Sequence, residues 1–318
     1  MTLALACASH SPLMFDRPGL CSAEVRAAIV RGFAELSDEV RRFEPELIVQ
    51  FSPDHFNGFL LDLMPTFCVG VAAESVGDWG TQAGPLDVPL HDATQLARTL
   101  VSANFDIAIS WRMQVDHGFV QIWEALFGSA RGLPLIPIFV NCAAPPLPTF
   151  RRARELGEAV GRFASASGRR VLIVASGGLS HDPPTPSIYD APLDIREHLI
   201  SGHHPTAASR AAREDRVRAA GLSAAGGSPS ALPVSEDWDR SFLKNLCEGP
   251  HAVFDDLDMD ELVRCAGRGG PEVLCWVSAM AALRSGGPAV TRMHAYHAVQ
   301  GWVAGMAILS GENLGAIS

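Results

Sequence analysis

The sequence lacks the features of several large protein classes. It has no CxxC pair, and its seven cysteines are an odd number spread along 318 residues, which indicates a reducing compartment rather than a disulfide framework or zinc ribbon. With 25 basic against 35 acidic residues, the net charge of −10 does not suit a nucleic-acid backbone. No apolar run approaches the roughly 18 residues of a membrane span. We therefore expect a cytoplasmic protein without a nucleic-acid or membrane partner.

Common enzyme signatures are absent as well. The chain has no HExxH helix of zinc proteases, no GxSxG nucleophile elbow, and no P-loop or Rossmann glycine spacing. Its two tyrosines, Tyr189 and Tyr296, do not follow predicted strands, which argues against a ring-cleaving iron(III)–tyrosinate site. The composition, 47% hydrophobic and 19% charged, is that of a globular protein that buries one or two sizeable cores.

Short apolar strands alternate with longer segments of helical periodicity, which predicts an α/β fold. We expect a central mixed or mostly parallel sheet with helices on both faces and a mainly helical C-terminal part. Strands are predicted at Leu3–Cys7, Leu47–Phe51, Ile107–Trp111, Leu135–Val140 and Val171–Ala175. Helices are predicted at Ala23–Arg42, Asp92–Ser102, Gln121–Phe127, Arg151–Ala164, Trp238–Leu246, Asp258–Cys265, Glu272–Leu283 and Trp302–Leu309.

The chain organisation favours one domain over residues 1–318. The segment Met1–Cys7 has no basic start and too short an apolar stretch for a signal peptide, so we interpret it as the first strand. From about residue 200 to 235 the sequence becomes rich in Ala and Arg and includes the run Gly226–Ser230. This composition indicates a variable connector or a mostly helical insertion.

Histidines mark the ends of the predicted strands. Of the eleven histidines, His10, His55, His117 and His181 follow strands directly. A single histidine in such a place is usually a loop or core residue. Because ligands bind at the carboxyl ends of strands in open α/β sheets, four histidines converging there predict a site.

Two of these histidines and a distant glutamate match a metal site. His10, His55 and Glu272 would give two imidazoles and one carboxylate, the set that holds Fe(II) while leaving positions open for substrate and dioxygen. Taken alone, Glu272 at the start of a predicted helix is better explained by the helix dipole. A zinc hydrolase could use the same three residue types, so the residues leave both chemistries open.

The other two histidines suit proton transfer. His117 and His181 would titrate near neutrality, as a general acid or base must. Asp54 and Asp116 immediately precede His55 and His117 and are weak candidates for orienting an imidazole. A solvated turn aspartate explains either of them equally well.

Several segments taken together resemble the class III extradiol ring-cleavage dioxygenases. The similarity covers nearly the whole chain and is weakest across about residues 200–235. Several motifs in one order are far more specific than any single one. The motifs are Ser9–Leu13, Ser52–Phe59, Met64–Cys68, Met113–Phe119 and Ser176–His181.

The resemblance implies roles for the five site residues. His10, His55 and Glu272 match the ligands of Fe(2+), His117 the proton donor and His181 the proton acceptor. The chain is most similar to members that use O2 to cleave 3-(2,3-dihydroxyphenyl)propionate and 2,3-dihydroxycinnamate in aromatic-acid catabolism. Cleavage beside the two hydroxyls would give a 2-hydroxy-6-oxo-nona-2,4-dienedioate type acid. The resemblance also implies a homo-oligomer such as a tetramer.

Other functions stay open at this point. The substrate could be another catechol or an aminophenol, and the same fold could carry a metal-binding hydrolase or a non-catalytic scaffold. A propionate side chain should meet a cation or amide donors. Arg112 and Arg292 are candidates that the sequence does not rank.

Overall fold

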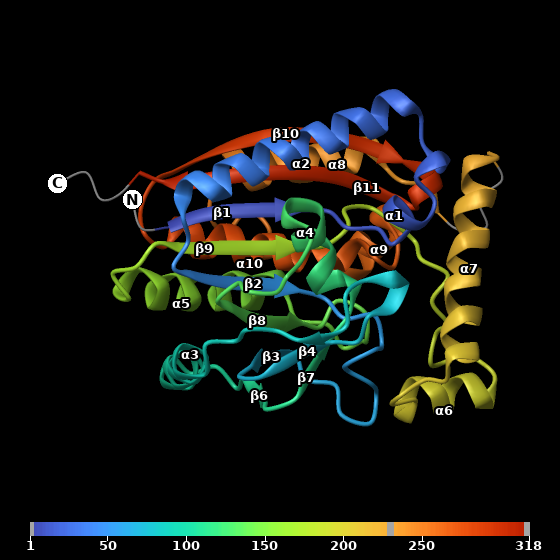
Figure 1. The fold of residues 1–318 in the computed structure, drawn as a ribbon, viewed down its shortest axis with the longest axis horizontal. Helices are drawn as coiled ribbons and strands as arrows, with labels where there is room; N and C mark the ends of the chain where they lie inside the picture. Colours follow the sequence, from blue (N-terminus) through green and yellow to red (C-terminus); the bar gives the residue numbers. More distant parts are fainter. Residues whose placement is uncertain (1–2, 228–231, 315–318) are drawn as a thin grey trace.

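One large sheet organises the computed structural model, which describes residues 3–227 and 232–314 (Figure 1). Within those residues the sheet has eight strands in the order β10-β11-β1-β9-β2-β8-β3-β6. β1, β9, β2 and β8 are parallel neighbours, whereas β11 and β3 pair antiparallel with β1 and β8, so the sheet is mixed. The strands are β1 (Leu3–Ala8), β2 (Leu47–Ser52), β3 (Phe67–Gly70), β6 (Ala108–Ser110), β8 (Leu135–Val140), β9 (Val171–Ser176), β10 (Ala289–Val299) and β11 (Ala304–Asn313).

Helices cover both faces of this sheet, as the alternation of elements predicts. On one face lie α3 (Leu90–Ser102), α5 (Phe150–Ala166), α8 (Glu236–Glu248), α9 (Met259–Ala266) and α10 (Val273–Arg284). The other face carries α1 (Leu13–Asp16), α2 (Ala23–Phe43) and α4 (His117–Phe127) (Figure 1). Each face therefore has its own apolar core. The α/β fold class is confirmed.

Smaller elements surround the carboxyl ends of the central strands. A second sheet joins β5 (Gly84–Pro85), β4 (Ala73–Ser75) and β7 (Met113–Val115). The helices α6 (Leu193–Ser201) and α7 (Ala207–Ala225) stand at the edge of the molecule toward which β1, β9 and β2 point (Figure 1). Single 3₁₀ turns lie at Pro18–Leu20, Asp78–Gly80, Gly270–Glu272 and Gln300–Trp302.

The second half of the chain departs from the predicted secondary structure at its C-terminal end. The helix predicted over Trp302–Leu309 is wrong: β11 occupies Ala304–Asn313 and pairs with β1 and β10, so the C-terminal part ends in a long hairpin. A short, fully buried apolar run does not distinguish helix from strand. The 200–235 segment contains α7, and residues 228–230 of the run Gly226–Ser230 lie outside the described residues. No helix in the described ranges is long and apolar enough to cross a membrane.

Helices α5 and α10 pack with their backbones in close approach. A Cβ atom at Gly157 of α5 would overlap the carbonyl oxygen of Ser278 in α10. The Ser278 hydroxyl also donates to the carbonyl of Ala153, at 2.9 Å. Glycine at residue 157 therefore lets α10 lie against α5, and the predicted ligand Glu272 is the residue immediately before α10.

Gly157→Ala is expected to lower the free energy of unfolding by about 1–3 kcal/mol, because the added methyl group must push two helix backbones apart. Chemical denaturation followed by circular dichroism measures the change. Gly19→Ala is the matched control, since a Cβ there meets nothing within 4 Å. Equal unfolding midpoints for Gly157→Ala and the wild type would contradict this account of the packing.

Candidate active site

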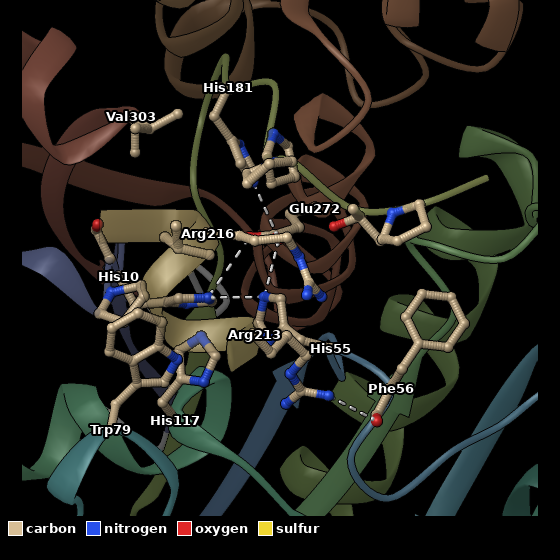
Figure 2. Close-up of a pocket in the computed structure, with 18 of the residues that line it drawn as sticks. His10, His55, Phe56, Trp79, His117, His181, Arg213, Arg216, Glu272 and Val303 are labelled. Atoms are coloured by element: carbon tan, nitrogen blue, oxygen red, sulfur yellow. Dashed lines mark hydrogen bonds and ion pairs between the residues drawn. The ribbon is translucent and has the colours of Figure 1, made fainter. Parts of the chain in front are cut away.

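Three neighbouring parallel strands bring three of the predicted histidines together. β1, β9 and β2 lie side by side, and His10, His181 and His55 follow their carboxyl ends. The His10 ring is fixed by Ser176, the last residue of β9, whose hydroxyl lies 3.0 Å from Nδ1. The predicted convergence of these histidines at the ends of the strands is thus present in the fold (Figure 2).

Glu272 reaches the same place from the opposite side. It ends the 3₁₀ turn Gly270–Glu272 that leads into α10, and its side chain is buried. The backbone N–H of Gly178, in the loop after β9, donates to Oε2 at 2.7 Å. Gly269 lets this turn lie against His181, since a Cβ atom at residue 269 would overlap the His181 ring.

The nitrogen and oxygen atoms of three residues point at one another. Nε2 of His10 lies 3.4 Å from Nε2 of His55, and Glu272 oxygens lie 3.7 Å and 3.2 Å from those two nitrogens. Adjacent ligands about 2.1 Å from one metal ion are about 3 Å apart, so these donors are spaced to share one ion. His117 offers a second trio with His10 and His55, whose ligand atoms all lie within 4.8 Å of one another.

The electrostatics of this cluster also suit a cation. Burial lowers the pKa of His10 to about 3, which keeps its imidazole neutral, the form that binds metal. Burial opposes ionisation of Glu272, but the facing imidazoles of His181, His55 and His10 outweigh it and hold its pKa well below the usual range. Among the described residues, Glu272 faces three histidines and forms no ion pair with an arginine or lysine. A buried carboxylate without an arginine or lysine fits a divalent metal.

Asp116 holds His55 rather than the adjacent His117. Its Oδ2 atom lies 3.1 Å from Nδ1 of His55 and accepts the backbone N–H of His55 at 2.8 Å. Burial would lower the pKa of His55, but Asp116 and then Glu272 more than offset this and raise it. Asp116 also caps α4 by accepting the N–H of Gly118. It therefore orients the imidazole that faces Glu272.

Asp54 stabilises a loop and does not orient an imidazole. Its carboxylate accepts the backbone N–H groups of Asn57, Gly58 and Phe59, and so shapes the loop that follows His55. Burial, and then the neighbouring Asp116, raise the pKa of Asp54 to about 7. Among the described residues, Asp54 forms no hydrogen bond with a histidine ring.

Asp116→Asn is expected to weaken metal binding about 10- to 100-fold, because the amide orients His55 without supplying negative charge. Asparagine still caps a helix well, so α4 should persist. Competition with a chelator measures the metal affinity, and Asp38→Asn, at an exposed ion pair on α2, is the matched control. Unchanged affinity in Asp116→Asn would show that His55 is held without this carboxylate.

His117 and His181 are each fixed through one ring nitrogen. Nδ1 of His117 lies 2.6 Å from Oδ2 of Asp78, and Oδ1 of the same carboxylate accepts the backbone N–H of His117. Nδ1 of His181 lies 2.8 Å from the carbonyl oxygen of Leu179, and its Nε2 lies 3.2 Å from Oε1 of Glu272. In both rings Nδ1 is held and Nε2 faces the cavity, where Nε2 of His181 meets Glu272.

The loop that carries His181 is supported from behind by a buried acid. Asp239, in α8, accepts the backbone N–H of Ser180 at 2.7 Å and the hydroxyl of Tyr296 at 2.9 Å. Burial raises the pKa of Asp239 to about 6. Tyr296 therefore belongs to the scaffold behind His181, which agrees with its exclusion as a metal ligand.

Comparison with known proteins identifies the family. Residues 4–307 match the family described as the catalytic LigB subunit of aromatic ring-opening dioxygenase. The chain belongs to this LigB family. Two proteins named 2,3-dihydroxyphenylpropionate/2,3-dihydroxicinnamic acid 1,2-dioxygenase are similar over 98% of it: one from Photorhabdus laumondii, 44% identical over 98% of its length, and one from Azotobacter vinelandii, 46% identical over 99%.

The family resemblance is confirmed by these matches. The LigB chain is an extradiol dioxygenase that acts on a small-molecule catechol and uses a metal cofactor. A crystal structure of an uncharacterized Escherichia coli K12 protein shares the fold, with a TM-score of 0.55, 14% identity, and coverage of 96% of this chain and 98% of that one.

One cavity of this LigB chain is lined both by the five predicted site residues and by residues of α6 and α7 (Figure 2). His10, His55, His117, His181 and Glu272 all line it. Two arginines of α7 line the same cavity, whereas Arg112 and Arg292 do not. Arg292 instead pairs with Glu35 and Glu39 on the surface. Further lining residues are Phe56, Trp79, Pro183, Pro184, Thr185, Pro186, Ile195, His198, Leu199, Arg213, Arg216, Val217, Trp302 and Val303.

Sequence reasoning missed several residues of this LigB site. Asp78 holds His117 but lies in none of the motifs, and Ser176 opens the Ser176–His181 motif but is far from His10 in the sequence, so nothing linked it to that histidine. The arginine-rich composition of the 200–235 segment was the available signal for Arg213 and Arg216, although composition does not show that the segment covers a site.

Proposed function

We propose that this chain is an Fe(II)-dependent dioxygenase that cleaves 3-(2,3-dihydroxyphenyl)propionate and 2,3-dihydroxycinnamate beside their hydroxyl pair. The observation that carries the proposal is one cavity holding two imidazoles and a carboxylate in mutual contact, with two further histidines beside them. The substrate is inferred from the names of relatives that are 44% and 46% identical. The product would be a 2-hydroxy-6-oxo-nona-2,4-dienedioate type acid.

His10, His55 and Glu272 are the proposed metal ligands. Imidazoles in their neutral form and a carboxylate suit Fe(II), and these three residues would hold the ion while leaving positions for substrate and dioxygen. Bound Fe(II) supplies the redox chemistry between dioxygen and the catechol. The three residues leave a single positive charge at the site, which favours an anionic, chelating substrate.

His181 is the proposed proton acceptor. When Nδ1 carries a proton and donates it to the carbonyl of Leu179, Nε2 presents a lone pair to the cavity. A catechol hydroxyl placed there can give up its proton to Nε2. Burial disfavours the charged ring, but Glu272 outweighs it and raises the pKa of His181, so the transferred proton is stabilised.

His117 is the proposed proton donor. Asp78 accepts from Nδ1 and fixes the ring from behind, so Nε2 is the nitrogen that delivers a proton to the departing oxygen. The ring also stacks on His55, with centroids 4.3 Å apart. His117 is thus held beside the proposed ligands while its Nδ1 is already engaged by Asp78.

Oxygen consumption tests the proposed function. After anaerobic loading with Fe(II), 3-(2,3-dihydroxyphenyl)propionate should give stoichiometric oxygen uptake and a yellow ring-opened product, and 3-phenylpropionate, which has no hydroxyls, should give neither. Uptake with another catechol or an aminophenol alone would overturn the substrate. No uptake with any catechol, despite bound Fe(II), would shift the function toward a metal-dependent hydrolase or a scaffold.

The assembly and the compartment are also proposals. We infer a homo-oligomer such as a tetramer in the cytoplasm, as the family resemblance implies. Sedimentation equilibrium measures the assembly: a monomer at all concentrations would contradict it.

A further inference from the structure

Helix α7 presents two arginines to the cavity without acidic partners. Arg213 and Arg216 line the cavity that contains Glu272 (Figure 2), and no carboxylate of the described residues forms an ion pair with either. An unpaired guanidinium at a cavity wall is a ready binding group for a carboxylate, which it can hold through two parallel hydrogen bonds.

The two acids of α7, Glu214 and Asp215, pair with a third arginine. Arg218 pairs with Asp16, Glu214 and Asp215, at 2.9–3.0 Å. The Arg218 guanidinium also lies over the ring of Trp79, 5.0 Å from its centroid. These contacts fix α7 over the cavity and at the same time leave Arg213 and Arg216 without acidic partners.

The two unpaired arginines differ in how they are held. Arg213 donates to the carbonyl of Phe56 at 3.2 Å and to Oδ1 of Asn57 at 2.5 Å, both in the loop after His55. Among the residues that the structure describes, Arg216 donates only to the carbonyl of Ala212 in its own helix, at 3.5 Å. Arg213 is therefore a fixed cation, whereas Arg216 has most of its guanidinium available.

The cavity that contains the two arginines and the histidines is also lined by apolar side chains. Ile195, Leu199 and Val217 line it together with Pro183 and Pro184. Such a wall suits a short hydrocarbon chain that joins an aromatic ring to a charged group. His198 lines the same cavity. Burial and then the charges of Arg213 and Arg216 lower its pKa and favour its neutral form.

We propose that Arg213 and Arg216 form the subsite that binds the side-chain carboxylate of the substrate, with Arg216 as its main ligand. The inference rests on the proposed function and adds the residues that select an acidic side chain. The α6–α7 segment would then determine which catechols are accepted, while the strand ends carry out the chemistry.

A specificity comparison tests this subsite. kcat/KM is measured for 3-(2,3-dihydroxyphenyl)propionate and for 3-propylcatechol, which has the same chain length without the carboxylate. Arg216→Gln should lower kcat/KM for the acid about 10- to 100-fold, the usual effect of losing a charged hydrogen bond, and leave the value for 3-propylcatechol nearly unchanged. Arg213→Gln should act in the same direction. Arg216→Lys should fall between, because lysine keeps the charge but not the planar fork.

Arg112→Gln is the matched control, because Arg112 is exposed, does not line the cavity and loses the same charge. Unchanged preference for the acid in both Arg216→Gln and Arg213→Gln would overturn the subsite. Equal losses with both substrates would also overturn it, because they would indicate a purely structural role. A wild-type protein that does not prefer the acid would instead count against the proposed function itself.

Discussion

His10→Ala or His55→Ala is expected to abolish retention of Fe(II) and reduce oxygen uptake to background. Either change leaves two of the three proposed donors, and the Nε2 and Oε atoms that face each other at 3.2–3.7 Å no longer enclose an ion. Because even a partner that only orients a ligand is worth about 10- to 100-fold in metal affinity, losing the ligand itself should cost more than 100-fold.

The measurement is iron content after anaerobic loading and gel filtration, together with the rate of oxygen uptake. His91→Ala is the matched control, since His91 lies exposed in α3 and outside the cavity. Circular dichroism checks that each variant is folded. Full iron content with full turnover in His10→Ala or His55→Ala would refute the ligand set.

Glu272→Gln distinguishes two ligand sets for the metal: His10 and His55 with Glu272, or His10 and His55 with His117. The carboxylate trio predicts that this variant loses iron, because a neutral amide neither balances the ion's charge nor binds it strongly. A trio of His10, His55 and His117 predicts instead that Glu272→Gln keeps iron and that His117→Gln loses it. The lack of any arginine or lysine paired with Glu272 in the described ranges favours the first outcome.

The sequence predicted the parts of the site that depend on local pattern. The runs before His10, His55 and His181 are almost entirely apolar because parallel strands are buried on both faces, so their ends were visible in the sequence. Glu272 was placed at the start of a helix by its Gly269-Gly270-Pro271 lead, and the structure has a 3₁₀ turn there that continues into α10.

The parts that depend on tertiary contact were not predictable. Asp78 meets His117 only because the loop after β4 folds back onto the start of α4. Asp116 precedes His117 in the sequence, but its Oδ2 atom lies beside Nδ1 of His55 while its Oδ1 atom caps α4. Arg213 and Arg216 needed the position of α7 over the cavity, which no periodicity encodes.

His117→Gln and His181→Gln are expected to keep iron and to lower turnover by about 10²–10⁴-fold, the usual contribution of a general acid or base. Glutamine fills much of the same space but does not accept and release a proton near neutrality. Iron content and single-turnover rates measure the two effects separately. His91→Gln is the control for the substitution itself, and loss of iron in His117→Gln or His181→Gln would show that the residue is a ligand.

If His117 donates the proton, Asp78 should contribute to the same step, because it holds Nδ1 of that ring. Asp78→Asn should lower turnover in the direction of His117→Gln, because the amide no longer holds Nδ1 with a charged acceptor 2.6 Å away. The double variant should then be little slower than His117→Gln alone, since residues that act as a unit are not additive. Additive losses would mean that Asp78 acts independently of His117, for example by holding the turn Asp78–Gly80 against α7.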